Sequence, residues 1–289
     1  MKITVEISNI RTDLYLAAQN REVSRKQIQR AIQSGLVLVN NKRVKPSFVL
    51  EEGMVITAKD VAWEAEKPLE YNPIALDLLY EDQHILLINK PVGVVVHPSP
   101  FCYETTLSDA ILSYCPSIRK IGESSRPGIV HRLDKNTEGV MIVAKSLLAY
   151  QSLVAQFKER RVKKSYYAVV SGVVKRDYMH IDRPIGKMKS DPRKFEVSQN
   201  GKPAQSELTV VKRYTNKTLL TVGLMTGRTH QIRVHLSAIG HPIMGDPVYG
   251  KAKPRAIQKL QAYRLSFFHP KTGHCMTFSL PLSPSLLVL

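Results

Sequence analysis

Residues 127–144 read Pro-Gly-Ile-Val-His-Arg-Leu-Asp-Lys-Asn-Thr-Glu-Gly-Val-Met-Ile-Val-Ala, and the rest of the chain is organised around them. Two apolar segments flank a polar loop that ends at Gly139, a pattern that predicts a loop at the end of strands with Asp134 near its apex. A lone aspartate in such a loop is commonly a turn former. Functional groups nevertheless favour loops that a rigid scaffold carries, so we interpret Asp134 as a candidate functional residue.

Charge is the most informative part of the composition. The 289 residues include 42 Lys and Arg against 24 Asp and Glu, a formal net charge of +18. Such a balance predicts a polyanionic partner, because neutralising phosphates releases counterions and drives nucleic-acid affinity. An anionic membrane surface is the alternative, but it usually requires a basic amphipathic helix with an aromatic apolar face, and we find no clear one. Nucleic acid is therefore the favoured partner.

Several other classes are disfavoured. No apolar run reaches the roughly 18 to 20 residues that span a bilayer, and residues 1–6 alternate like a strand instead of forming a signal peptide. The three cysteines form no C-x-x-C pair, which argues against disulfides and zinc ribbons. His230 and His235 are five residues apart and no H-E-x-x-H occurs, so we expect no metal. A cytoplasmic protein with no membrane contact is the simplest reading.

With a usual size of about 100 to 200 residues per domain, the length of the chain predicts two domains. Residues 1–60 form the smaller one. Ser24 to Gln27 fits a capping box that opens a helix ending near Gly35. A hairpin follows, turning at Asn40-Asn41, and then a strand at 54–57. The candidate phosphate contacts of this domain are Arg25, Lys26, Arg30, Lys42 and Arg43; a solvated basic face without a ligand is the alternative.

Residues 61–75 read as a linker and 76–289 as the larger domain, of α+β class with a central mixed or antiparallel sheet and flanking helices. We predict strands at 85–88, 94–96, 165–171 and 218–225, a helix from Ser146 to about 160 and another carrying 231–233. The segments 265–270 and 276–280 should pair at one edge of the sheet. Residues 173–204 look more like a solvated loop than an RNA-binding one.

Four stretches together resemble a known enzyme family. His131-Arg132-Leu133-Asp134 with Thr137 and Gly139 closely resembles the catalytic motif of the RluA/RluD family of RNA pseudouridine synthases, and residues 81–98, 164–172 and 227–250 resemble its other motifs. The resemblance covers about residues 76–289. Residues 1–60 resemble the small RNA-binding domain named after ribosomal protein S-four.

The resemblance implies roles for particular residues. Asp134 would be the essential carboxylate, Arg233 its paired cation, and Tyr166 the active-site tyrosine that offers a ring for stacking and a hydroxyl for proton handling. Arg132 would fill the stack that a flipped base vacates. The remaining candidates for RNA contact are His131, which could instead satisfy a backbone group, Lys90, which could instead be structural, and Arg228.

The implied reaction converts uridine to pseudouridine and needs no cofactor. By resemblance, large-subunit ribosomal RNA is the favoured substrate and transfer RNA is the alternative. We expect the protein to be a monomer. A non-catalytic ribosome-assembly protein on the same fold would be expected to lack Asp134, Tyr166 or Arg233. A glycosidase would need a second catalytic carboxylate, for which Glu138 is a poor candidate. Glu138 also occupies the position before the motif's glycine, where the family often has a small residue. This difference bears on the choice of substrate.

Overall fold

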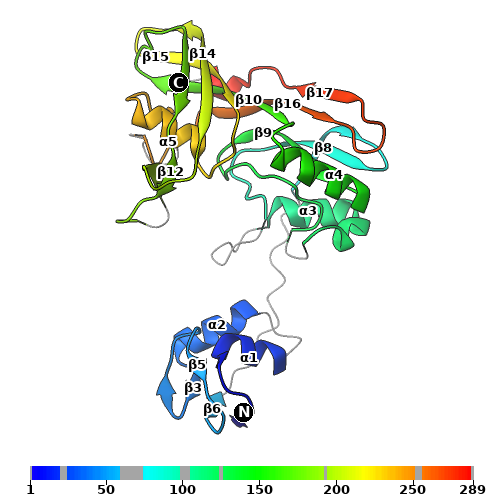
Figure 1. Cartoon of the computed structure of the whole chain (residues 1–289), viewed down its shortest axis with the longest axis vertical. Helices are drawn as coiled ribbons and strands as arrows, with labels where there is room; N and C mark the ends of the chain where they lie inside the picture. Colours follow the sequence, from blue (N-terminus) through cyan, green and yellow to red (C-terminus); the bar gives the residue numbers. More distant parts are fainter. Residues whose placement is uncertain are drawn as a thin grey trace. The chain divides into compact units, whose positions relative to one another are not determined.

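The computed structural model describes residues 2–19, 25–58, 74–97, 105–123, 126–191, 194–250 and 256–287; the side chains of Arg25 and Lys26 lie outside this description. The chain forms two compact units, residues 1–71 and 72–289 (Figure 1). Of the segment expected to be a linker, residues 61–73 lie outside the described part, and so does the helix cap expected at Ser24. Each unit is described below by itself.

The N-terminal unit packs two helices against small sheets. Its elements are β1 (Lys2–Thr4), β2 (Ile10–Arg11), α1 (Thr12–Gln19), α2 (Arg25–Ser34), β3 (Val37–Val39), β4 (Lys42–Arg43), β5 (Val49–Leu50) and β6 (Val55–Ala58). One sheet has the order β1-β6-β3-β4, and β2 pairs with β5. Ile28 and Ile32 of α2 are buried, while Asn40 and Asn41 turn the hairpin with positive φ. These features confirm the predicted helix and hairpin.

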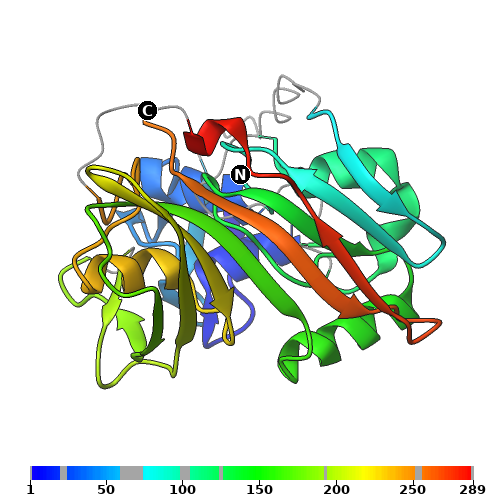
Figure 2. The ribbon, with the colours of Figure 1, turned by 90° about the horizontal axis from the view of Figure 1, so that it is seen from above.

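The second unit is built on a nine-stranded sheet of order β11-β14-β15-β10-β16-β9-β8-β7, with β17 paired to β16. Its strands are β7 (Asp77–Glu81), β8 (Ile85–Lys90), β9 (Glu138–Ala144), β10 (Lys163–Ser171), β11 (Tyr178–Asp182), β14 (Gln205–Arg213), β15 (Lys217–Leu224), β16 (Leu260–Phe268) and β17 (Cys275–Ser279). The β16–β9 pair is parallel and the other pairs are antiparallel. Figure 2 shows these long strands running side by side. The predicted α+β class with a central mixed sheet is confirmed.

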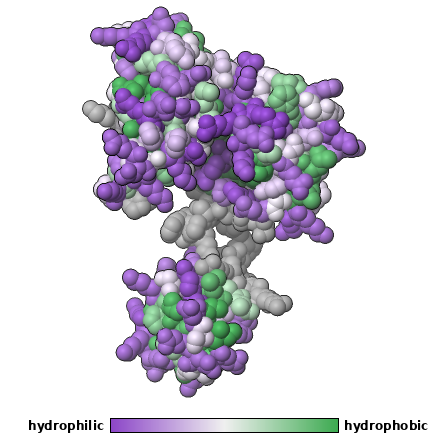
Figure 3. Space-filling view, viewed as in Figure 1, coloured by the Kyte–Doolittle hydropathy of each residue, from purple (hydrophilic) through white to green (hydrophobic). Residues whose placement is uncertain are grey.

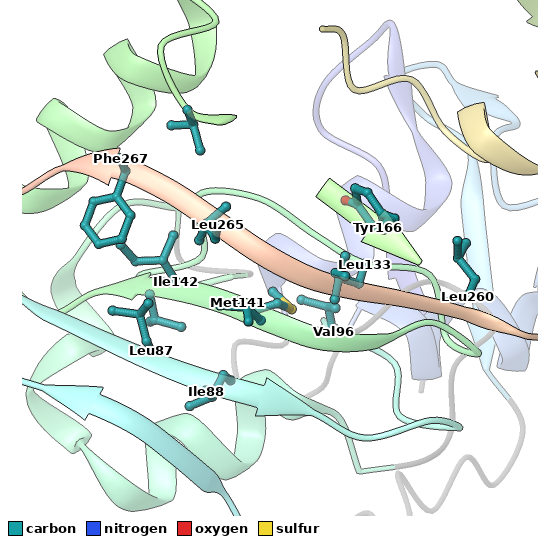
Figure 4. Packing of buried hydrophobic residues seen from close by; sticks show 14 of the residues in the cluster. Leu87, Ile88, Val96, Leu133, Met141, Ile142, Tyr166, Leu260, Leu265 and Phe267 are labelled. Carbon is teal, nitrogen blue, oxygen red and sulfur yellow. The ribbon is translucent and has the colours of Figure 1, made fainter. Parts of the chain in front are cut away.

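Helices cover this sheet and complete the core. They are α3 (Leu107–Tyr114), the 3-10 turn η1 (Pro116–Lys120), α4 (Leu147–Lys158), α5 (Gln231–Ala238) and α6 (Pro284–Leu287). Ser146 caps α4 through a hydrogen bond from Ala149 N to its Oγ, as the sequence predicted. The main core joins β8, β9, β10 and β16 and extends to Leu133 and Tyr166 (Figure 4). The core therefore reaches the Asp134 loop.

Alternation along β10 separates its two tyrosines, as expected. Tyr166, Ala168 and Val170 belong to the main core. Tyr167 and Val169 join a second cluster on the opposite face together with Leu286 of α6. Because successive strand side chains point to opposite faces, the two tyrosines cannot share a role.

Three local predictions were wrong. Residues 94–96 are not a strand, because the carbonyls of Val95 and Val96 accept the first N–H groups of α3. The sequence pattern of α4 also predicts Val154 on the inward face of the helix, but its side chain is exposed. Residues 173–204 are not a solvated loop, because β11 joins the main sheet and a hairpin forms from β12 (Ile185–Lys187) and β13 (Phe195–Val197). These three short strands bury only Ile181 and Ile185, so their sequence carries little apolar pattern.

Candidate active site

The loop that carries Asp134 is held by its backbone. Asp134 O accepts from Thr137 N at 3.1 Å, and Lys135 O accepts from Gly93 N at 2.9 Å. The side chain of Thr137 accepts from the amide of Gln258 at 3.1 Å, and both residues are buried. With these bonds made, the Asp134 side chain remains about one-quarter exposed at the surface of a rigid turn.

Gly139 allows the loop to enter β9 directly beside β16. Its φ is +126°, and a Cβ at this position would lie 2.2 Å from the carbonyl oxygen of Ala262. No other residue type tolerates both the backbone angle and the contact. The close approach fixes where β9 begins, and thereby the position of the preceding loop.

Arg233 brings two carboxylates together. Its Nη1 donates to Asp134 Oδ2 at 2.9 Å, while Nε and Nη2 donate to the two oxygens of Asp246 at 2.8 and 3.0 Å. We call these three residues the arginine cluster. The pairing of Arg233 with Asp134 expected from the sequence is present as a single hydrogen bond. The bidentate interaction of Arg233 is made with Asp246. Arg233 can bind both carboxylates at once because a guanidinium has separate donor edges.

Asp246 was missed as a site residue, although it lies in the stretch 227–250 that resembles a family motif. It is fully buried, and its Oδ1 also accepts from the backbone N–H groups of Val248 and Tyr249. Burial acts to raise the pKa of Asp246, but the hydrogen bonds from Arg233 and these amides outweigh it and hold the pKa below its usual value. The signal that could have found it is charge balance, since a buried arginine needs a buried acceptor on each donor edge.

Tyr166 forms part of the cavity wall. It is 8% exposed, and burial together with the nearby Asp134 carboxylate raises the pKa of its hydroxyl far above the usual value. The phenol therefore stays protonated at neutral pH. Tyr166 therefore contributes an aromatic ring and a neutral hydroxyl to the residues that line the cavity.

His230 is a second residue that sequence reasoning missed, having been weighed only as a metal ligand. It precedes α5 in the left-handed conformation, with φ +57°. Its Nδ1 lies 2.9 Å from the hydroxyl of Tyr249, and its Nε2 lies 3.9 Å from Asp134 Oδ2. Burial lowers the pKa of His230 despite the opposing carboxylate of Asp134, so the ring is neutral at pH 7. A non-glycine residue in this conformation is uncommon and often marks a functional site.

His131 and Lys90 have structural partners. His131 Nε2 accepts from Ile142 N at 3.0 Å, and burial lowers the pKa of His131 to about 3. This geometry supports the backbone-satisfying role that was left open. Lys90 is fully buried and donates to the carbonyls of Pro91, Val94 and Lys135 at 2.7 to 3.1 Å. The expectation that Lys90 contacts RNA is therefore corrected, because its ammonium is committed beneath the Asp134 loop.

One cavity of about 520 Å³ collects six of the seven candidates of the large unit: Asp134, Tyr166, Arg233, Arg132, His131 and Arg228 all line it. Arg132 is exposed at this cavity. Arg228 donates from Nε to Pro203 O at 3.0 Å. Lys90 does not line the cavity. In the N-terminal unit, Arg30, Lys42 and Arg43 are exposed. In the described ranges no group of three potential ligands could hold a metal.

The second-carboxylate alternative finds little support in the geometry. Glu138 is half-buried and its Oε1 accepts from Ser285 Oγ at 2.7 Å, in the C-terminal segment. Asp246 has each oxygen committed to Arg233, and Oδ1 also to two amides. Asp134 is thus the carboxylate of the cluster that lines the cavity, which suits a reaction with one essential carboxylate better than a two-carboxylate hydrolysis.

Polar and apolar residues are distributed unevenly over the visible surface of the large unit (Figure 3). Hydrophilic residues dominate the visible face of the large unit, and apolar residues form separate patches (Figure 3). None of the helices in the described ranges is long and apolar enough to cross a bilayer.

Comparison with known proteins finds similar sequences over nearly the whole chain. The family described as RNA pseudouridylate synthase matches residues 84–238, and the S4 domain matches residues 11–56. An RNA pseudouridine synthase of Aquifex aeolicus is 42% identical over 97% of this chain and 92% of its own length. The ribosomal large subunit pseudouridine synthase D of Pseudomonas aeruginosa is 39% identical over 100% of this chain and 93% of its own. The solved human RNA pseudouridylate synthase domain containing 1 is 29% identical, with a TM-score of 0.60 over 73% of this chain and 86% of that one.

Proposed function

Because the chain belongs to the RNA pseudouridylate synthase family, a class of isomerases, we propose that it converts uridines of large-subunit ribosomal RNA to pseudouridine through Asp134. The relatives named for the large ribosomal subunit support this substrate. The S4 domain match and the exposed cations Arg30, Lys42 and Arg43 support RNA binding by the N-terminal unit. Arg25 and Lys26 remain proposed partners of the same RNA.

The observation that carries the proposal is the arginine cluster at the cavity. Arg233 is fixed by Asp246 on two donor atoms and presents its third to Asp134 at 2.9 Å. The Asp134 carboxylate is thereby positioned in a cavity large enough for a nucleoside while its charge is compensated. A paired, partly exposed carboxylate needs no prior activation to act as a nucleophile or base.

The reaction is an isomerisation and is balanced within the substrate. The bond from N1 to C1′ of the ribose breaks, the uracil turns, and a bond from C5 to C1′ forms. C5 loses a proton and N1 ends with one, so no oxidant or reductant is consumed. Asp134 supports the cleavage, and Tyr166 supplies a surface for the turning base and a neutral hydroxyl for hydrogen bonding. Stacked uridine must first leave the helix at a cost of roughly a few kcal/mol.

Arg132 is proposed to help with this last step. Its side chain is exposed at the cavity two residues before Asp134. A planar guanidinium can stack on bases, so it can occupy the space that the flipped uridine leaves. Arg228, half-buried at the same cavity, is proposed as a second RNA contact.

The test is release of tritium from RNA labelled at uridine C5, because the C5 proton must leave when pseudouridine forms. Wild-type protein is incubated with ribosomal and transfer RNA from cells that lack it. We expect release from large-subunit ribosomal RNA. Release from transfer RNA alone would contradict the substrate, and binding without release from either RNA would favour the ribosome-assembly alternative.

A further inference from the structure

The cavity also contains a lysine, Lys164, which differs from Arg233 of the arginine cluster because it has no anionic partner among the described residues. Lys164 lies on β10, two residues before Tyr166, and both line the cavity. Within the ranges that the structure describes, its ammonium has no carboxylate, carbonyl or hydroxyl at hydrogen-bond distance. Its neighbour in space is the ring of Phe157, with Nζ 6.0 Å from the ring centroid.

The surroundings of this ammonium are built without negative charge. Phe157 stacks on His131 with centroids 4.8 Å apart, and His131 is neutral because its pKa lies at about 3. A Cβ on Gly227 would lie 3.2 Å from Nζ, so the absence of a side chain at Gly227 leaves space for the ammonium. We call Lys164, Phe157 and Gly227 the lysine wall.

Leaving a largely buried ammonium unpaired is costly, because a charge loses hydration without gaining a partner. Burial lowers the pKa of Lys164 accordingly. Other cations line the same cavity, namely Lys158, Arg160, Arg132 and Arg228. A site that holds a desolvated cation among further cations is complementary to an anion that arrives from outside.

We propose that Lys164 binds a backbone phosphate next to the uridine that enters the cavity. This inference rests on the proposed function, since the anion of an RNA substrate is its phosphodiester. Lysine binds phosphate as a point charge, and charge-assisted hydrogen bonds are about twice as strong as neutral ones. Phosphate is therefore favoured over a uracil carbonyl as the ligand.

The first experiment measures RNA binding without turnover. Full-length protein carrying Asp134→Asn is titrated with decauridylate at several salt concentrations, alone and combined with Lys164→Met, Lys164→Arg or Lys163→Met. Lys163 is the matched control, because it is exposed on β10, does not line the cavity and carries the same charge. We expect Lys164→Met to weaken binding about tenfold in 0.1 M salt and to reduce the slope of log K against log salt by about 0.7.

Lys164→Arg should keep the slope, and Lys163→Met should change affinity by less than about twofold. The thermal midpoint of Lys164→Met should equal or exceed that of its parent, because the variant removes an unpaired buried charge. Parental affinity and slope in Lys164→Met would overturn the proposal. So would a fall in the thermal midpoint that accompanies the loss of binding, since that result would make Lys164 a structural residue.

A second experiment identifies the phosphate. A nine-nucleotide RNA with one central uridine is made with each flanking phosphate replaced in turn by an uncharged methylphosphonate. One replacement should weaken binding to the parent and leave binding to Lys164→Met unchanged, because the contact is then already absent. Equal losses in both proteins at both positions would overturn the proposal. Tritium release by wild-type protein tests the proposed function independently of either result.

Discussion

In the arginine cluster the guanidinium of Arg233 donates to two carboxylates, whereas in the lysine wall the ammonium of Lys164 has no such acceptor among the described residues. Both cations line one cavity. The first is compensated within the protein, so it can fix geometry before any ligand arrives. The second is left for a ligand to compensate. Buried charge that is paired contributes to the fold, and buried charge that is unpaired marks where a partner of opposite sign belongs.

The largest effect is expected from Arg233→Ala. This change leaves the fully buried Asp246 without its ion pair, so the free energy of unfolding should fall by about 3 to 5 kcal/mol, and tritium release should fall by at least about 100-fold. Urea unfolding and the release assay measure the two losses. Arg161→Ala is the control, because Arg161 pairs with Glu159 on the surface and should change little. Wild-type stability in Arg233→Ala would remove the distinction between paired and unpaired cations.

Tyr166→Phe sharpens the comparison within one strand. Tyr166 and Lys164 share a face of β10, yet we assign proton handling to the first and phosphate binding to the second. The variant should lower turnover by about 100-fold, the usual scale for losing a positioned proton donor, with unchanged affinity for decauridylate. Single-turnover release and a binding titration measure these quantities. Unchanged turnover would assign Tyr166 to packing alone.

Asp246→Asn tests the ion pair of the arginine cluster through the pH dependence of the unfolding free energy. The substitution keeps the shape but removes the charge, and we expect a loss of about 2 kcal/mol in unfolding free energy at pH 7. Because hydrogen bonds hold the pKa of Asp246 below its usual value, the stabilisation is complete above about pH 4 and is lost as the pH falls through the folded-state pKa. The difference from wild type should therefore shrink in acid. A difference that is constant from pH 7 to pH 3 would contradict the ion-pair account.

The sequence predicted about half of the elements of the large unit, including the central strands β8, β9 and β10, because their patterns are long. Ile85–Ile88, Val140–Ala144 and Ser165–Ser171 bury apolar side chains in runs or strict alternation, and Ser146 marks the start of α4 by its cap. The short strands β11 to β13 were missed because they are three to five residues long and bury only Ile181 and Ile185, which leaves little pattern. Their partners lie more than twenty residues away in β14 or close a small hairpin that only tertiary contacts specify.

The residues of the candidate site were likewise predicted only in part. Asp134, Tyr166 and Arg233 came from motif resemblance, and the structure brings them to one cavity. The sequence did not predict the roles of Asp246, His230 and Lys164. Their hydrogen bonding and burial depend on which segments meet in space, and the sequence alone does not show this. Lys90 shows the converse error: a lysine in a motif looked like an RNA contact, although three carbonyls bind it beneath the loop.

The most direct test of the account is tritium release by Asp134→Asn in a single turnover, with RNA binding and thermal unfolding measured on the same preparation. Asp134 is partly exposed and adds one hydrogen bond to an arginine that Asp246 already holds, so the variant should fold and bind decauridylate as wild-type protein does. We predict no release above background. Release at the wild-type rate would contradict the claim that this carboxylate carries the reaction.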